Sequence, residues 1–258
     1  MKLTILGSGT SHGVPMIGCS CAVCRSEDPF DLRSRPSAML ELDDKRVLID
    51  SGPELRMQLI RERIDMIHAV VYTHAHADHI YGLDDLRVFS MRGRGPLNAY
   101  ATPDTAAVIR TVFPYVFNGG PSRGGGVPQI TLNEINGPFE GAGIPFQPIP
   151  IWHGPTPVMA YRVGDLAYVT DVSRIEPESL NRLRGLDVLV LDALRFRPHP
   201  THFSIPEALA IVDDLKPKRT FFTHICHDLP HAETNRHLPP GVELAYDGLV
   251  IELANPIR

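Results

Sequence analysis

The sequence predicts an α/β protein made of helical layers and mixed sheets, and three observations support this class. Short apolar segments, many of them β-branched and bounded by Gly, Pro or Asp, alternate with segments of helical periodicity. Two-residue polar turns, at Asp43 with Asp44 and at Gly164 with Asp165, join neighbouring apolar segments as in hairpins. The composition is globular, with 43% hydrophobic and 21% charged residues in 258. Because hairpins give antiparallel pairs and crossover helices give parallel pairs, mixed sheets are expected.

The predicted strands are short apolar runs. In chain order they cover residues 3–6, 38–42, 47–50, 69–72, 99–101, 129–132, 149–151, 159–163, 166–170, 187–191, 219–223 and 249–253. The predicted helices cover 54–63, 83–91, 105–113, 177–184 and 206–215. Pro177 and Pro206 suit the first turns of the last two helices, where a missing N–H costs nothing, and Glu176 and Ser204 lie near their starts.

No change in composition marks a domain boundary, so we expect residues 1–258 to form a single domain. The apolar run near the N-terminus is too short for a signal peptide, and no apolar stretch of 18 residues occurs. We therefore expect a cytoplasmic protein that does not contact membranes. The segment 118–128, with five glycines and two prolines, is expected to be a loop, either a surface insertion or a cover over a substrate.

Histidine is unusually frequent, with twelve residues in the chain. One predicted strand runs directly into the motif His-x-His-x-Asp-His at 74–79. Because side chains alternate along a strand, His74 and His76 lie on one side and can bind one metal ion, whereas Asp78 and His79 can face another ion as the chain turns into a helix. A cluster of surface histidines would not explain so many metal donors in one run.

Three further metal donors follow later predicted strands, directly or within two residues. They are His153, Asp171 and His224. A single His or Asp at a strand end is more often a cap or a packing residue. The order of these donors after the first motif is what makes them informative.

That order is His-x-His-x-Asp-His, a single His, an Asp after a strand and a Thr-His near the C-terminus, and it resembles the metallo-β-lactamase superfamily over nearly the whole chain. The segment Leu-Ile-Asp-Ser-Gly at 48–52 matches the superfamily's early Asp-x-Gly turn. The resemblance implies a four-layer αββα sandwich with two mixed sheets. It also implies two metal ions, one on His74, His76 and His153, the other on Asp78, His79 and His224, with Asp171 bridging them.

A closer resemblance narrows the branch of the superfamily. The β-lactamases proper are exported, and this sequence shows no export signal. The opening Gly-Ser-Gly-Thr-Ser-His-Gly-Val-Pro at 7–15, the cluster Cys-x-Cys-x-x-Cys at 19–24 and Thr-His-Ile-Cys-His at 223–227 are similar to the carbon–phosphorus lyase phosphodiesterase (PhnP-type) family.

The cysteines fit this resemblance. In a reducing compartment, Cys19, Cys21 and Cys24 within six residues indicate a metal site more than disulfides. The family resemblance implies a structural zinc on these cysteines and His227, which is a closed tetrahedral site. Cys226 stays open as the alternative fourth ligand, because spacing cannot separate adjacent residues.

The same resemblance implies roles around the leaving group. His202 corresponds to the family's motif histidine, and an imidazolium at this place can donate a proton to a departing alkoxide. Arg195 and His199 are candidates for contacts with a second phosphate. Asp78 and Asp171 would hold the ions and orient a hydroxide, so Asp78 is counted with His202 as catalytic.

We therefore expect hydrolysis of a small anionic phosphodiester at two divalent ions. Such a pair lowers the pKa of a water and offsets charge in an in-line displacement. Nitrogen and oxygen ligands suit Mn, Zn or Fe, so the active-site metal stays open. By resemblance the substrate is phosphoribosyl 1,2-cyclic phosphate or a 2′,3′-cyclic nucleotide. The oligomeric state is open, with a homodimer among the options.

Two other functions are alternatives. A tRNA 3′-end processing endonuclease of the same superfamily would need a basic surface for RNA phosphates. The formal net charge is −5, the glycine-rich segment holds only Arg123, and Arg87, Arg92 and Arg94 form a small cluster, so nucleic acid is not expected as a partner. The second alternative is a non-hydrolytic binding protein of the pyrroloquinoline-quinone biosynthesis type, which has a similar cysteine cluster but lacks the complete ligand set for two ions.

Overall fold

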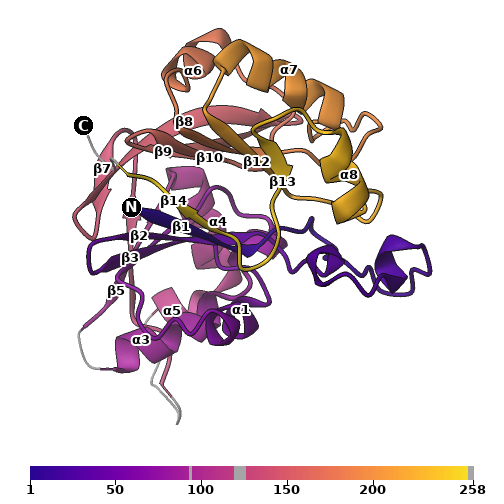
Figure 1. Ribbon diagram of the computed structural model, residues 1–258. Coiled ribbons are helices and arrows are strands. Elements are labelled where there is room, and N and C mark those ends of the chain that lie inside the picture. Colours follow the sequence, from indigo (N-terminus) through magenta and orange to yellow (C-terminus); the bar gives the residue numbers. More distant parts are fainter. Residues whose placement is uncertain (93–94, 119–125, 255–258) are drawn as a thin grey trace.

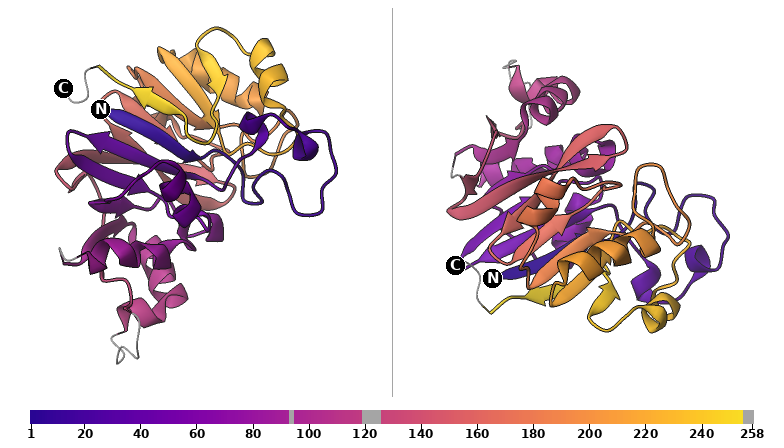
Figure 2. Two further views of the ribbon diagram at one scale, coloured as in Figure 1. Left: turned by 60° about the horizontal axis from the view of Figure 1, so that its bottom comes forward. Right: turned by 90° about the horizontal axis from the view of Figure 1, so that it is seen from above.

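Figure 1 shows the computed structural model, which describes residues 1–92, 95–118 and 126–254. Two sheets of seven strands each face one another, and helices cover the two outer surfaces (Figures 1 and 2). This arrangement is the predicted αββα sandwich. Most of the glycine-rich segment, residues 119–125, lies outside the described residues. Within the described ranges, none of the helices combines the length and the apolar character needed to span a membrane.

The first sheet contains both chain ends. Its strands are Lys2–Gly7 (β1), Ser37–Leu42 (β2), Lys45–Ile49 (β3), Ala69–Val71 (β4), Leu97–Ala101 (β5), Ile130–Glu134 (β6) and Val250–Glu252 (β14). Their spatial order is β14-β1-β2-β3-β4-β5-β6, antiparallel from β14 to β3 and parallel from β3 to β6. Because β14 pairs with β1, the two ends of the described chain lie side by side (Figure 1).

The second sheet has the same division into antiparallel and parallel parts. Its strands are Phe139–Gly141 (β7), Ile144–His153 (β8), Thr156–Val163 (β9), Leu166–Val169 (β10), Val188–Asp192 (β11), Arg219–Thr223 (β12) and Val242–Leu244 (β13). Their order is β13-β12-β11-β10-β9-β8-β7, antiparallel from β7 to β10 and parallel from β10 to β13. Both sheets are therefore mixed, as predicted.

The five predicted helices are present, with shifted ends, and the structure adds three more. They are Leu55–Arg61 (α1), Ala77–Ile80 (α2), Arg87–Met91 (α3), Pro103–Val112 (α4), Pro114–Phe117 (α5), Pro177–Arg182 (α6), Ile205–Leu215 (α7) and His231–His237 (α8). The predicted helix at 83–91 is a 3-10 turn, Leu83–Leu86, followed by α3. The start of α7 carries a capping box, in which the Ser204 backbone N–H donates to the Glu207 carboxylate. The short α2 and α5 and the polar α8 lack the apolar periodicity that predicts helices.

Strand β8 is much longer than the predicted 149–151, because its three prolines hide the pattern. Proline has no backbone N–H to donate to a neighbouring strand, so it is tolerated on a strand edge that has no partner strand. Among the described strands, β7 pairs with β8 alone, over the first three residues of β8. Beyond it, α6 covers the open edge, where Ser179 Oγ donates to the Pro150 carbonyl and Arg182 donates to the Pro148 carbonyl, each at 2.6 Å.

Three apolar clusters fill the spaces between the four layers. In β1, Leu3 and Ile5 face the other sheet and Leu6 faces the helices, and in β4 Val71 faces the other sheet and Val70 faces the helices. This is the period of two that a strand buried on both faces requires. A third cluster lies between the second sheet and α6 and α7.

Two hydrogen bonds join the sheets directly before the histidine motif. The buried Tyr161 hydroxyl in β9 donates to the Tyr72 carbonyl at 2.8 Å, and the Met159 N–H donates to the Thr73 carbonyl at 3.0 Å. Tyr72 and Thr73 follow β4, so these bonds fix the chain at the point from which the metal donors begin.

We predict that Tyr161→Phe destabilises the protein. The change leaves the buried Tyr72 carbonyl without its donor, which costs about 1–3 kcal/mol in the free energy of unfolding. Tyr168→Phe is the matched control, since Tyr168 is equally buried in the same cluster but its hydroxyl has no partner among the described residues. Urea unfolding should show a loss for the first variant and no loss, or a gain, for the second. Equal losses would contradict this account.

Candidate metal centre

The candidate metal centre lies at one edge of the sandwich, where strands of both sheets end. Strands of common direction in one sheet bring their carboxyl ends to the same edge, which is where ligands bind in open α/β sheets. The polar residues at these ends are Asp50 after β3, the motif 74–79 after β4, His153 in the last position of β8, Asp171 after β10, Asp192 in the last position of β11 and His224 after β12.

The structure brings the seven predicted metal ligands together. His74, His76, His153 and Asp171 form one group, and Asp78, His79 and His224 form another, with the ligand atoms of each group within 4.8 Å of one another. The carboxylate of Asp171 lies between the groups, because its oxygens are 3.9 Å from His74 Nε2, 3.2 Å from His79 Nε2 and 3.3 Å from His224 Nε2.

These donors fit divalent cations. The Nε2 atoms of His74, His79 and His224 are buried and have no hydrogen-bond partner among the described residues. Buried polar atoms without partners are rare in native proteins, and here three of them converge on two carboxylates. A cation bound between them would satisfy all three, and imidazole with carboxylate is a donor set that suits Zn²⁺, Mn²⁺ or Fe²⁺.

Other side chains fix the imidazoles so that Nε2 faces the centre. Asp50 accepts a hydrogen bond from His79 Nδ1 at 2.7 Å and from Thr73 Oγ1 at 2.7 Å. Thr73 Oγ1 in turn lies 3.0 Å from His74 Nδ1. A proton on Nδ1 leaves the lone pair on Nε2, which is how partners outside the ligand set orient metal-binding histidines.

His153 is held by the loop that carries His202. Its Nδ1 donates to the Thr201 carbonyl at 2.7 Å. The next residue, Gly154, has a φ of 59°, and a Cβ there would lie 2.7 Å from Thr201 Cγ2. Glycine is therefore required where the β8–β9 turn passes this loop.

The charges of the centre stabilise one another. Burial raises the pKa of the Asp78 carboxyl group. The imidazoles of His79 and His224 lower this pKa by more than burial raises it, so it lies below its usual value. Burial also opposes ionisation of Asp171, and His224 and His79 again bring its pKa well below its usual value. In return, burial lowers the pKa of His224 but Asp171 and Asp78 raise it to about 9. The buried carboxylates therefore favour a cation in this place, either a proton on an imidazole or a metal ion.

Three of the seven non-glycine residues that have a left-handed φ in the described chain lie at this centre. Asp50, Asp171 and His224 adopt left-handed φ values of 60°, 53° and 58°. Residues with a side chain pay roughly 1 kcal/mol or more for this conformation, which persists at sites where the surrounding structure holds it.

His202 lies against both groups. Its imidazole is stacked on His224, with ring centroids 4.6 Å apart, and meets His153 at the same distance. His202 Nδ1 donates to Asp192 Oδ2 at 2.7 Å, and the same oxygen accepts the Val172 N–H at 2.8 Å. Sequence reasoning missed Asp192, although its place at the end of a strand was the available signal.

The two candidate phosphate contacts behave differently. His199 lies beside His202, with ring centroids 5.2 Å apart. Arg195 donates to the carbonyls of Arg197 and Pro198 in its own loop at 3.2 and 3.0 Å. The structure therefore brings His199 to the centre, whereas Arg195 supports the loop.

The three cysteines gather around His227 in the segment that projects from the side of the sandwich (Figure 1, indigo). His227 Nδ1 lies 3.3 Å from Sγ of Cys19 and of Cys21. Tetrahedral zinc bonds place sulfur and nitrogen ligands ~3.5 Å apart, so this group has the dimensions of a zinc site. The Cys24 N–H and His227 lower the pKa of the Cys21 thiol to about 6, which favours the thiolate that zinc binds.

Cys226 is outside this group. Its thiol is buried, and its sulfur accepts the Asp228 N–H at 3.4 Å. The geometry therefore favours His227 as the fourth zinc donor.

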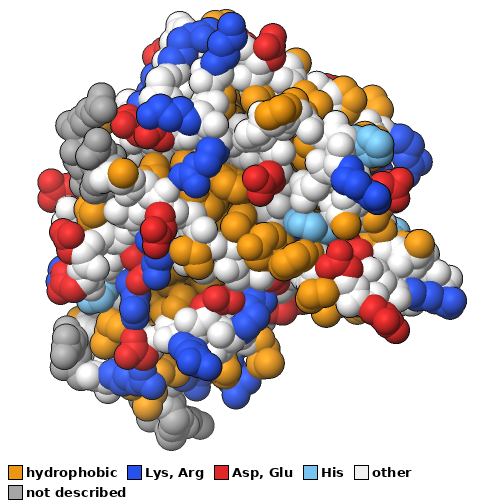
Figure 3. Space-filling model, viewed as in Figure 1, with side chains coloured by type: hydrophobic (Ala, Val, Ile, Leu, Met, Phe, Trp, Pro, Cys, Tyr) orange, Lys and Arg blue, Asp and Glu red, His pale blue; other side chains and the backbone are white. Residues whose placement is uncertain are grey.

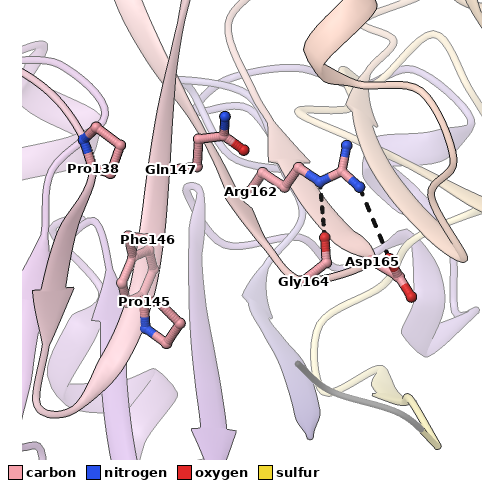
Figure 4. Close-up of a pocket in the computed structure, with 7 residues that line it drawn as sticks. All are labelled: Pro138, Pro145, Phe146, Gln147, Arg162, Gly164 and Asp165. Atoms are coloured by element: carbon pink, nitrogen blue, oxygen red, sulfur yellow. Dashed lines mark hydrogen bonds and ion pairs between the residues drawn. The ribbon is translucent and has the colours of Figure 1, made fainter. Parts of the chain in front are cut away.

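A separate hollow, shown in Figure 4, lies at the opposite end of β8. Pro145, Phe146 and Gln147 line it, and Arg162 there donates to the Gly164 carbonyl at 2.8 Å. Strand β8 rises roughly 3.3 Å per residue, so this hollow is about 20 Å from His153. It is not part of the metal centre.

Comparison with known proteins shows the family. A sequence profile of the beta-lactamase superfamily domain matches residues 45–225. A solved structure described as a new diphosphatase from the PhnP family is 50% identical, with 97% of this chain and 96% of that chain covered and a TM-score of 0.91. The chain belongs to the PhnP family of the beta-lactamase superfamily. It is a hydrolase of the metallo-β-lactamase fold, as the motifs predict.

Two curated relatives carry other names. The octanoyltransferase of Porphyromonas gingivalis is 38% identical over 96% of this PhnP-family chain, which spans only 51% of that protein's length. The coenzyme PQQ synthesis protein B of Methylorubrum extorquens is 25% identical over 98% of this chain and 100% of that protein. The names of these two relatives therefore describe different functions.

We predict that Cys21→Ser removes one zinc ion per chain, because a serine hydroxyl does not replace the thiolate. Cys226→Ser, which changes a neighbouring cysteine outside the group, should retain that zinc. Elemental analysis of both purified variants measures the metal content. The reverse result, with zinc lost only from Cys226→Ser, would show that Cys226 is the ligand.

Proposed function

We propose that this PhnP-family chain is a metal-dependent phosphodiesterase that hydrolyses small cyclic phosphodiesters, either phosphoribosyl 1,2-cyclic phosphate or 2′,3′-cyclic nucleotides. The observation that carries the proposal is the pair Asp192–His202, which adds a proton donor to the metal centre at a position between His153 and His224. The name of the 50% identical relative, a diphosphatase, supports a reaction at a phosphoryl group.

The ligand assignment belongs to the proposal. Two divalent ions, Mn²⁺ or Zn²⁺, would bind to His74, His76 and His153 and to Asp78, His79 and His224, with Asp171 between them. When bound, such ions lower the pKa of a water and offset charge on the phosphoryl oxygens. Asp78 would orient the attacking water, and Asp50 and Thr201 keep the imidazoles aligned. Zinc on the three cysteines and His227 would have a structural role only.

His202 is proposed as the general acid. Its Nδ1 is engaged by Asp192, so Nε2 remains to hold a proton for the leaving oxygen. The Asp192 carboxylate stabilises the imidazolium, as the aspartate of a catalytic triad does. Because Asp192 is also fixed by the Val172 N–H, the ring keeps one orientation.

RNA processing is less well supported. Figure 3 shows Lys and Arg interspersed with Asp and Glu over one face of the molecule, without a continuous basic surface. Arg87 pairs with Asp84, and Arg92 donates to the Asp65 carbonyl at 2.7 Å. Arg87 and Arg92, the two described members of the small basic cluster, therefore already have partners, and Arg94 and Arg123 lie outside the described residues.

We predict that the chain, supplied with Mn²⁺ or Zn²⁺, hydrolyses cyclic phosphodiesters and leaves precursor tRNA intact. The measurement is turnover of 2′,3′-cyclic AMP, of phosphoribosyl 1,2-cyclic phosphate and of a precursor tRNA under one set of conditions. Cleavage of the tRNA alone would contradict the proposal. So would inactivity on every substrate with only one tightly bound zinc per chain, which is the result expected of a non-hydrolytic binding protein.

We predict that His202→Ala lowers kcat about 10²–10⁴-fold on an ester with an alkoxide leaving group. The loss should be much smaller on a 4-nitrophenyl ester, whose leaving group departs without a proton. His237→Ala, at an exposed histidine of α8, serves as the control and should keep both rates. Full activity of His202→Ala on the alkoxide ester would refute the acid role.

A further inference from the structure

A pocket of about 360 Å³ opens beside the metal centre, between the start of α4 and the start of β9. Two of its lining residues, His74 and His76, belong to the centre itself. When a phosphodiester reacts at the centre, one of its two ester groups can therefore extend into this pocket. We call this space, which is lined on one side by Thr102, Asp104, Thr105 and Val108, the α4 pocket.

The walls of the α4 pocket are largely apolar. Val108 of α4, which is 43% exposed, faces this space together with Pro157 and Met159 of β9. These side chains offer flat and flexible apolar surface to a ring, and the volume is sufficient for an organic group of moderate size.

Asp104 gives the pocket its charge. Among the described lining residues it is the only Asp, Glu, Lys or Arg, and its carboxylate makes no hydrogen bond or ion pair within the described chain. The carboxylate is therefore free to accept hydrogen bonds from a ligand.

The α4 N-terminus does not reverse this charge. A helix N-terminus carries a partial charge of roughly +0.5, which attracts anions. Here the Thr102 side chain already accepts one of the free N–H groups, that of Thr105. The full negative charge of Asp104 in the first turn exceeds this half charge, so the α4 side of the pocket is negative and disfavours an anionic group there, opposite the cations that His74 and His76 would hold.

We propose that the α4 pocket binds the uncharged sugar and base of a nucleoside phosphodiester, and that Asp104 selects against a second phosphate. The hydroxyl and amino groups of a nucleoside donate to the Asp104 carboxylate, and the faces of its rings contact Val108, Pro157 and Met159. This inference rests on the proposed phosphodiesterase function. It favours 2′,3′-cyclic nucleotides over phosphoribosyl 1,2-cyclic phosphate, whose 5-phosphate would meet Asp104.

Equilibrium binding tests the pocket without requiring turnover. Metal-loaded protein is titrated calorimetrically with adenosine 3′-monophosphate and with adenosine 3′,5′-bisphosphate, which differ by one phosphate. We expect the bisphosphate to bind about five-fold or more weakly to the unchanged protein, and Asp104→Asn to reduce this difference at least about three-fold. Glu178→Gln is the matched control, since Glu178 follows Pro177 at the start of α6 just as Asp104 follows Pro103 at the start of α4.

A kinetic comparison fixes the orientation of the ligand. In 2′,3′-cyclic AMP and its 5′-phosphorylated form only the cyclic ester reacts, so the ratio of their kcat/KM values reports the 5′ group. This ratio should fall in Asp104→Asn and stay constant in Glu178→Gln.

The inference is overturned by bisphosphate binding that equals or exceeds that of the monophosphate, by an unchanged difference in Asp104→Asn, or by failure of both nucleotides to bind. A distinct outcome separates it from the proposed function. If no phosphodiester is hydrolysed while the binding difference and its dependence on Asp104 hold, the phosphodiesterase proposal fails and the assignment of the pocket stands.

Discussion

The buried carboxylate of Asp171 sets the constraint that the rest of the structure satisfies. It lies between imidazoles contributed by both sheets, in a place where unpaired charge is costly and water is largely excluded. Asp50 and Asp192 are also buried carboxylates paired with imidazoles. Each accepts a hydrogen bond from the Nδ1 atom of a histidine, His79 and His202 respectively. The two sheets must meet at a fixed distance for these groups to face one another, which is the role of the bonds from β9 to the end of β4.

One short segment, residues 224–227, connects the metal centre with the cysteine cluster. His224 belongs to the first and His227 to the second. Between them, the Ile225 N–H donates to the Ser8 carbonyl at 2.9 Å and the Ile225 carbonyl accepts the Thr10 N–H at 3.1 Å. A zinc ion on the cysteines would thus anchor the N-terminal segment against the strand end that delivers His224, which would explain why the cysteine cluster lies so close to the candidate metal centre.

The fold and the donors close in sequence were predictable, because a strand followed by His-x-His-x-Asp-His carries its geometry in its own spacing. Contacts that depend on where a side chain points in the folded chain could not be predicted from the sequence. Asp192 holds His202 across an irregular loop, and an aspartate at a strand end is usually a simple cap. Cys226 and His227 are adjacent, so only the folded chain shows which side chain turns toward the cysteines. The three prolines of β8 conceal a strand whose open edge is covered by α6. Asp104 lines the pocket beside the centre from a helix that carries no motif.

The central claim is that Asp171 lies between two divalent ions. Anomalous X-ray scattering from crystals loaded with Mn²⁺ tests it most directly, because the signal locates manganese independently of zinc. The account predicts two manganese peaks about 3.5–4 Å apart on either side of the Asp171 carboxylate, and a separate zinc peak among the cysteines. A single manganese peak, or peaks away from Asp171, would contradict it.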